Sequence, residues 1–287
     1  MNKMKRIISG LKSEKNGYCR ITHKRGWFGY LKDGDTAFTP QDLKKTIVRV
    51  VEKNPPRGEK LFNLDWCRQG KRSHFTMLPK KLKLEVPVQP YRKEEALERF
   101  IVLSNGDRFY NQIPIGGGKE SIDIGIKESD SKFIFVELKP WESGNNPLYA
   151  LIESLKNLIE YRTILKRKIT KIEEYKHIEL MVLAPIAYYQ TYKLLEPNGM
   201  RSESNLSVIR GTLSKIRSEF KEFNLATISF RALPDFGKPE FLQKCWEVYK
   251  GEFKGQTKEL VQLTGAHAIP LLARDRWKLV VSTDEIS

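Results

Sequence analysis

Asp123, Glu137 and Lys139 are the charged residues of this sequence that are best placed to do chemistry. They lie in two short runs, SIDIGI (residues 121–126) and KFIFVELK (residues 132–139), which have the Ile, Phe and Val content of β-strands. Charged side chains are rarely left inside buried strands without a partner or a function. These three residues are therefore the first candidates for a functional site.

Side chains alternate across a β-strand, so the position of each residue in a run predicts the face on which it lies. In residues 121–126 the three isoleucines share one face, which leaves Asp123 on the other face between two small residues. In residues 132–139 the side chains of Glu137 and Lys139 share one face with two phenylalanines. A proline directly after Lys139 predicts the end of the strand, because proline has no backbone N–H group to donate.

A hairpin turn through residues 127–132 brings Asp123 and Glu137 to the same sheet face, near one end of the two strands. Two carboxylates held together repel each other unless a cation lies between them. Mg²⁺ suits such a pair, because it binds through few carboxylates together with waters and substrate phosphates. Lys139 points the same way and is placed to contact an attacking water or a phosphate oxygen. This pattern predicts metal-assisted hydrolysis of a phosphodiester.

The spacing of these residues resembles the motif of the PD-(D/E)XK nuclease superfamily, which has the restriction-endonuclease-like fold. Asp123 is followed by thirteen intervening residues and then by Glu137, Leu138 and Lys139, in a strand, turn and strand with a helix on either side. The resemblance covers about half of the chain, residues 93–233. It implies that Asp123 and Glu137 bind the metal, that Leu138 contributes its carbonyl oxygen, and that Lys139 assists the nucleophilic water.

Further positions bear on the resemblance. Many members carry a glutamate on the first helix that completes the metal site, and EEALERFIVL (residues 94–103) fits such a helix. Glu94, at the edge of its apolar face, is the first candidate there. Asn157 and Tyr161 lie one helical turn apart in the places of a Gln-x-x-x-Tyr motif, so the resemblance implies that they contact nucleic acid. The asparagine departs from that motif, as does Ile122, which stands where the superfamily's name has a proline.

The positive charge of the chain is concentrated in its first third. The formal net charge is +16, from 51 basic and 35 acidic residues. Residues 1–93 hold 23 Lys or Arg against 8 Asp or Glu, a net of +15, so the remaining 194 residues carry a net of +1. Such an asymmetry predicts a segment that binds a polyanion, most often nucleic acid, although a basic surface can also serve solubility alone.

We interpret residues 1–90 as a basic module that binds nucleic acid. Strands are predicted at residues 18–22 and 27–31, and a helix begins at Thr39-Pro40, a threonine cap followed by proline at the first helical position. Basic residues are interleaved with aromatic ones, a mixture able to grip phosphates and stack on bases. Four cations of this module are expected to contact nucleic acid: Lys24, Arg25, Lys71 and Arg72.

The fold predicted for the rest of the chain is α/β, a mixed central β-sheet flanked by helices with a restriction-endonuclease-like core. A proline-containing linker at residues 85–90 separates the basic module from this core, which spans residues 91–235 and is followed by a C-terminal helical extension, residues 236–287. Helix and strand patterns follow the order α-β-β-β-α-β-α-β along the core. The expected helices are residues 94–103, 147–168 and 205–223, and the expected strands are residues 107–115, 121–126, 132–139, 178–189 and 226–233.

A zinc site in the basic module is an alternative place for chemistry. Cys19, His23, Cys67 and His74 are zinc-ligand types, but their spacing is loose. Three widely separated cysteines suit a reducing compartment better than a disulfide framework. The chain has no apolar run of about 18 residues and its start lacks the pattern of a signal peptide, so we expect a cytoplasmic protein without membrane contact.

These features predict a metal-dependent endonuclease that hydrolyses double-stranded DNA, with Mg²⁺ as its cofactor and Mn²⁺ able to replace it. The predicted catalytic residues are Asp123, Glu137, Lys139 and Glu94, and the predicted metal ligands are Asp123, Glu137, Leu138 and Glu94. Because the sequence does not distinguish DNA from RNA, a ribonuclease of the same fold stays open. Further alternatives are a catalytically inactive DNA-binding protein on this fold and an unrelated basic regulator. Cutting both strands of a duplex would favour a homodimer.

Overall fold

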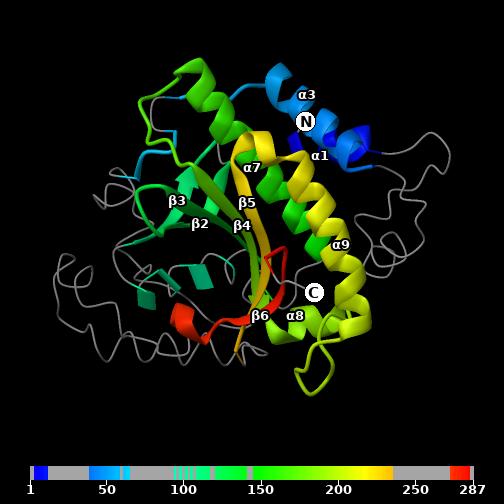
Figure 1. Cartoon of the computed structure of the whole chain (residues 1–287). Helices are drawn as coiled ribbons and strands as arrows, with labels where there is room; N and C mark the ends of the chain where they lie inside the picture. Colours follow the sequence, from blue (N-terminus) through cyan, green and yellow to red (C-terminus); the bar gives the residue numbers. More distant parts are fainter. Residues whose placement is uncertain are drawn as a thin grey trace, which may run out of the picture.

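A six-stranded mixed β-sheet lies at the centre of the structure, which is a computed structural model (Figure 1). The structure describes residues 3–11, 39–58, 61–64, 94, 97–98, 101–102, 104–105, 108–116, 120–140, 145–234 and 272–284. The strands follow one another across the sheet in chain order: β1 (Phe109–Pro114), β2 (Ser121–Lys127), β3 (Lys132–Leu138), β4 (His177–Pro185), β5 (Leu225–Leu233) and β6 (Lys278–Ser282). The predicted α/β class with a mixed sheet is confirmed.

The strands are antiparallel at the two sides of the sheet and parallel in its middle. β1, β2 and β3 pair antiparallel, and β6 pairs antiparallel with β5. β3, β4 and β5 pair parallel, because a helix crosses over between each pair: α7 (Pro147–Arg167) after β3 and α9 (Glu203–Glu219) after β4. The carboxyl end of β3 thus lies between the start of β2 and the carboxyl end of β4. This end of the sheet carries the predicted site.

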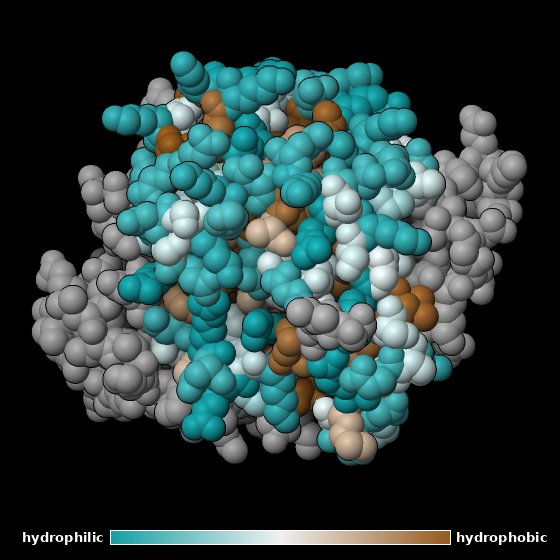
Figure 2. All heavy atoms as spheres, in the orientation of Figure 1, coloured by the Kyte–Doolittle hydropathy of each residue, from teal (hydrophilic) through white to brown (hydrophobic). Residues whose placement is uncertain are grey.

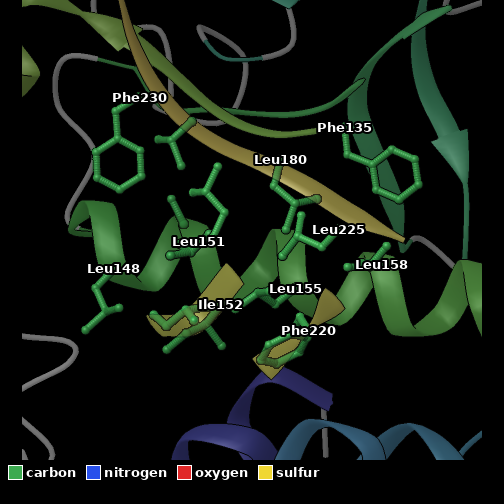
Figure 3. Packing of buried hydrophobic residues seen from close by; sticks show 14 of the residues in the cluster. Phe135, Leu148, Leu151, Ile152, Leu155, Leu158, Leu180, Phe220, Leu225 and Phe230 are labelled. Atoms are coloured by element: carbon green, nitrogen blue, oxygen red, sulfur yellow. The ribbon is translucent and has the colours of Figure 1, made fainter. Parts of the chain in front are cut away.

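Two layers of helices cover one face of the sheet. α7 packs on β3 and β4, and α9 packs on β5 and β6. A helix near the N-terminus, α3 (Pro40–Lys53), packs on the outer side of α7 and α9 and is itself contacted by α1 (Lys3–Gly10). Figure 3 shows the apolar side chains of α7, among them Leu151 and Leu155, between the sheet above and the blue helices below.

The long helix α7 is buried on nearly every side because it is the middle layer. Asn146 caps its start by accepting a hydrogen bond from the backbone N–H of Tyr149 at 2.8 Å, and Pro147 occupies the first turn. The helix ends at Lys168, whose backbone is left-handed (φ 50°). Its burial means that any polar side chain on its sheet-facing side needs a partner or a function.

The predicted start of the helix at Thr39-Pro40 is confirmed. Thr39 and Asp42 cap it reciprocally, the side chain of each accepting from the backbone of the other. Ile7, Leu43 and Ile47 are fully buried and belong to the same apolar core as α7 and the sheet. The described part of the predicted N-terminal module therefore packs against the sheet's helices rather than standing apart from them.

One predicted strand is too long. β4 ends at Pro185, and residues 186–189, predicted as strand, belong to the short helix α8 (Ile186–Thr191). Proline has no N–H group for a further ladder bond, and the hydroxyl of Tyr189 turns back to donate to the carbonyl oxygen of Val182 at 2.7 Å.

Several predictions fall on residues outside the described ranges and stay predictions. They are the strands at 18–22 and 27–31, the linker at 85–90 with the domain boundary after it, most of the C-terminal helical extension, the four cations Lys24, Arg25, Lys71 and Arg72, and the alternative zinc ligands Cys19, His23, Cys67 and His74. The described end of that extension is not helical: β6 pairs with β5 and belongs to the central sheet, beyond the predicted end of the core at residue 235. In the part of the chain that the structure describes, no helix is both long and apolar enough to span a membrane.

Candidate active site

The hairpin of β2 and β3 sets Asp123 beside Glu137, as predicted. Ile124 lies opposite Val136 in the antiparallel register, so the next pair toward this end of the sheet is Asp123 and Glu137. Oδ2 of Asp123 accepts a hydrogen bond from the backbone N–H of Leu138 at 2.9 Å. This bond fixes the carboxyl group of Asp123 at the end of β3, next to the predicted triplet.

Lys139 places its ammonium group among three carboxyl groups. Its Nζ lies 2.5 Å from Oε1 of Glu137, 3.3 Å from Oε2 of Glu153 and 3.5 Å from Oε1 of Glu94. Only 5% of the surface of Lys139 is exposed, and the same is true of Glu137. The four predicted residues Asp123, Glu137, Lys139 and Glu94 are thus brought together at one place.

Glu153 on α7 is a member of the cluster that the sequence analysis missed. A usable signal was present, because Glu153 lies four residues before Asn157, and residues four apart share one face of a helix. Asn157 had been singled out as a nucleic-acid contact on that helix. Since Glu153 lies on the same face of the helix as Asn157, the sequence also predicts that Glu153 is near the site.

The cluster has too little positive charge for its four carboxyl groups. Burial raises the pKa of Glu137 well above its usual range, and the charges of Asp123 and Glu153 raise it further. Burial also raises the pKa of Asp123 to about 7 and that of Glu94 above its ordinary value, although Lys139 opposes both shifts. Burial acts on Glu153 in the same direction, but the charge of Lys139 and a hydrogen bond with Glu137 outweigh it, so the pKa of Glu153 is lowered. One ammonium group does not neutralise this set.

A divalent metal ion fits the donor chemistry of these residues. In the described ranges, no group of three or more acidic, His or Cys side chains is already arranged around a point that would hold a metal. The carboxylates of Asp123 and Glu137, with the carbonyl oxygen of Leu138, are nevertheless the hard oxygen donors that Mg²⁺ prefers. The raised pKa values of Asp123 and Glu137 indicate that further positive charge is favourable here, and metal binding would release their protons.

The cluster opens into a cleft of about 580 Å³. Gln112 reaches this cleft from β1, where its backbone is left-handed (φ 52°) between Asn111 and Ile113 although the pairing with β2 keeps its register. Its Nε2 donates to Oε2 of Glu98 at 2.7 Å, and its Oε1 accepts from the hydroxyl of Ser121 at 2.8 Å. These two hydrogen bonds hold Gln112 as a fixed polar group in the wall of the cleft.

Helix α1 forms another wall of the cleft. Met4 lines it, and Lys3 forms ion pairs with Glu120 at 2.9 Å and with Glu160. Glu160, fully buried on α7, also pairs with Lys156 at 3.5 Å. The N-terminal helix is thus held at the cleft by buried charges, which ties this part of the chain to the candidate site.

Asn157 and Tyr161 do not lie together at the cleft. Asn157 lines it and is 3% exposed, and its Oδ1 has no hydrogen-bond partner among the described residues. Tyr161 is fully buried, with its hydroxyl donating to the carbonyl oxygen of Glu173 at 2.8 Å and its ring 4.7 Å from that of Phe62. Asn157 keeps its predicted place, whereas a nucleic-acid contact by Tyr161 has no support, because the residue is part of the core.

Replacing Asp123 by asparagine is expected to raise the free energy of unfolding of the metal-free protein at pH 8 by about 1 to 3 kcal/mol. The pKa of Asp123 is raised from 3.8 to about 7 in the folded protein. Between these values the unfolded chain releases the proton that the folded protein keeps, so this residue lowers stability progressively as the pH rises and destabilises fully above pH 7. Urea unfolding of wild type and Asp123→Asn from pH 4 to pH 8 measures the difference. Equal stabilities at pH 8 would contradict the pKa shift.

No family model matches the chain, and no curated protein and no solved structure matches it either. The chemistry of the cleft has to be inferred from its own residues.

Proposed function

We propose that the chain is a metal-dependent endonuclease that hydrolyses phosphodiester bonds of DNA in this cleft. The observation that carries the proposal is the convergence of Asp123, Glu137 and Lys139 at the ends of two paired strands, with Glu94 and Glu153 around the ammonium group. Burying four carboxyl groups around one lysine lowers the stability of the fold, and such destabilising clusters are typical of functional sites. Resemblance to the PD-(D/E)XK motif supports the same reading.

Asp123, Glu137 and the carbonyl group of Leu138 would hold the metal, with Glu94 as an additional ligand. A bound Mg²⁺ supplies a Lewis acid that polarises the phosphate and activates water. The two predicted ligand carboxyls belong to one hairpin, and the hydrogen bond from the Leu138 N–H to Asp123 orients one of them. Rigid strands hold such ligands more precisely than loops do.

Lys139 acts as a charged hydrogen-bond donor rather than as a base. Burial alone would lower its pKa, but the surrounding carboxylates, Glu137 first, raise the pKa of Lys139 well above its usual range. An ammonium group that stays protonated cannot accept the proton of the attacking water. It can orient that water and stabilise the negative charge that develops on the phosphate oxygens. The proton of the water then passes to a carboxylate of the cleft or to solvent.

Cleavage assays on four polymers test the proposal and select the substrate. Supercoiled plasmid, linear duplex DNA, single-stranded DNA and RNA are incubated with the protein in Mg²⁺, in Mn²⁺ and in EDTA. Duplex DNA is expected to be cut with either metal and left intact in EDTA. Preferential cutting of RNA would make the protein a ribonuclease. Binding of these polymers without any cutting would favour the inactive DNA-binding protein.

A further inference from the structure

The end of α7 that lies away from the cleft carries a dense group of exposed cations. Residues 162–176 contain six Lys or Arg against two Glu, a net of +4, within the larger part of the chain whose total is only +1. Five of these cations are exposed and form what we call the distal basic patch: Lys166, Arg167, Lys168, Lys171 and Lys176. The patch lies at the upper end of α7 in Figure 1, and Figure 2 shows a largely hydrophilic surface over this part of the molecule.

The two glutamates of the segment do not neutralise the patch. Glu173 pairs with Lys127 on β2 at 2.8 Å, and Glu174 pairs with Arg162 at 2.9 Å. Within the described ranges, the side chains of the five patch residues have no hydrogen bond or ion pair. Their charges are therefore available to an external partner.

The number and placement of these cations exceed what the helix itself needs. One or two cations near a helix C-terminus suffice to interact with its dipole. Lys168 in addition occupies the left-handed position that ends α7 (φ 50°), where glycine or asparagine is favoured.

The distal basic patch lies on the order of 20 Å from the cleft, since thirteen residues of helix separate Lys166 from Glu153 at about 1.5 Å each. It is a separate surface, not an extension of the cleft. Its apolar residues Ile169 and Ile172 are half-buried, and the large hydrophobic residue that is exposed in the described part of the chain is Met200, in the turn between α8 and α9. A protein partner would be expected to use apolar contacts, whereas a phosphate backbone is bound mainly by charge.

We propose that the distal basic patch is a second nucleic-acid-binding surface, which contacts the phosphate backbone independently of sequence. The inference rests on the proposed nucleic-acid substrate but not on cleavage. The four cations predicted to contact nucleic acid all lie in the basic module, residues 1–90, because the chain after residue 93 has a net charge of only +1. Within that part of the chain, residues 162–176 alone carry a net charge of +4, and the structure exposes five of their cations on one surface.

The test is the salt dependence of duplex binding, measured by fluorescence anisotropy in EDTA so that no cleavage occurs. The patch variant carries Lys166→Gln, Arg167→Gln, Lys168→Gln and Lys171→Gln. The control variant loses the same charge from four exposed cations on elements away from the patch: Lys193→Gln, Lys215→Gln, Arg276→Gln and Lys278→Gln. Thermal unfolding of both variants confirms that they are folded.

The patch variant is expected to bind at least about 10-fold more weakly than wild type at 100 mM salt, with a logarithmic salt slope reduced by about 2 to 4, while the control changes less than about 3-fold. Equal losses in the two variants would overturn the proposal, because net charge alone would then explain them. So would unchanged binding by the patch variant, a loss seen on anionic vesicles but not on duplex, or a wild-type protein that binds no duplex. Absence of cleavage in Mg²⁺ would overturn the proposed nuclease activity without touching this result.

Discussion

Replacing Glu137 by glutamine is expected to lower the rate of metal-dependent cleavage at least about 1,000-fold and to leave the protein folded. Glutamine has nearly the shape of glutamate and carries no charge, and burial raises the pKa of Glu137 because it disfavours the charged form of this group. The fold is therefore not disturbed, but the carboxylate that would bind the metal is lost. Single-turnover cleavage of a labelled substrate and urea unfolding measure the two effects.

A buried glutamate outside the cleft gives the matched control. Glu179 on β4 is 5% exposed, as Glu137 is, and accepts a hydrogen bond from the hydroxyl of Ser229 at 2.7 Å. Glu179→Gln is expected to change the cleavage rate less than about 3-fold, because the residue does not line the cleft. Equal losses of activity in the two variants would mean that burial of a glutamate, not its place in the cluster, determines the result.

Replacing Lys139 by methionine is expected to abolish cleavage and also to lower the free energy of unfolding by about 3 to 5 kcal/mol. The ammonium group lies within 3.5 Å of the carboxyl groups of Glu94, Glu137 and Glu153, so its removal leaves their negative charge uncompensated. The destabilisation should grow as the pH rises, since the carboxyl groups can take up protons at low pH. Added Mg²⁺ should restore part of the lost stability, because it supplies the missing charge.

A double-mutant cycle separates charge balance from packing. In Glu137→Gln the cluster has one carboxyl group fewer, so Lys139→Met should cost less in that background than in wild type. Urea unfolding of the four proteins at pH 8 in EDTA measures the coupling. Equal costs of Lys139→Met in both backgrounds, or no destabilisation at all, would contradict the view that Lys139 neutralises the cluster.

Local patterns in the sequence predicted the elements of the site well. Alternation along residues 121–126 and 132–139 gave the faces of Asp123, Glu137 and Lys139, and the hairpin between these strands is confirmed. The start of α3 at Thr39 was predictable because a capping residue followed by proline has one favoured structure. In each case, neighbours in the chain determine the geometry.

Contacts between distant segments were not predictable in the same way. Glu153 reaches Lys139 only because α7 crosses beneath the end of β3, and helical spacing alone gives its face but not that crossing. Tyr161 shares the helix with Asn157, yet one turn further along α7 the surroundings are the aromatic core around Phe62 rather than the cleft. The contact of α1 with the cleft through Lys3 likewise depends on packing across most of the chain.

The measurement that tests the central claim most directly is the rate of cleavage of the preferred substrate across a series of Mg²⁺ concentrations, for wild type beside Asp123→Asn and Lys139→Ala. A wild-type rate that rises to saturation with Mg²⁺ and falls to zero in EDTA, with both variants inactive at every concentration, is the predicted result. Cleavage that persists in EDTA, or that the two variants retain, would show that the cleft formed by Asp123, Glu137 and Lys139 is not a metal-dependent nuclease centre.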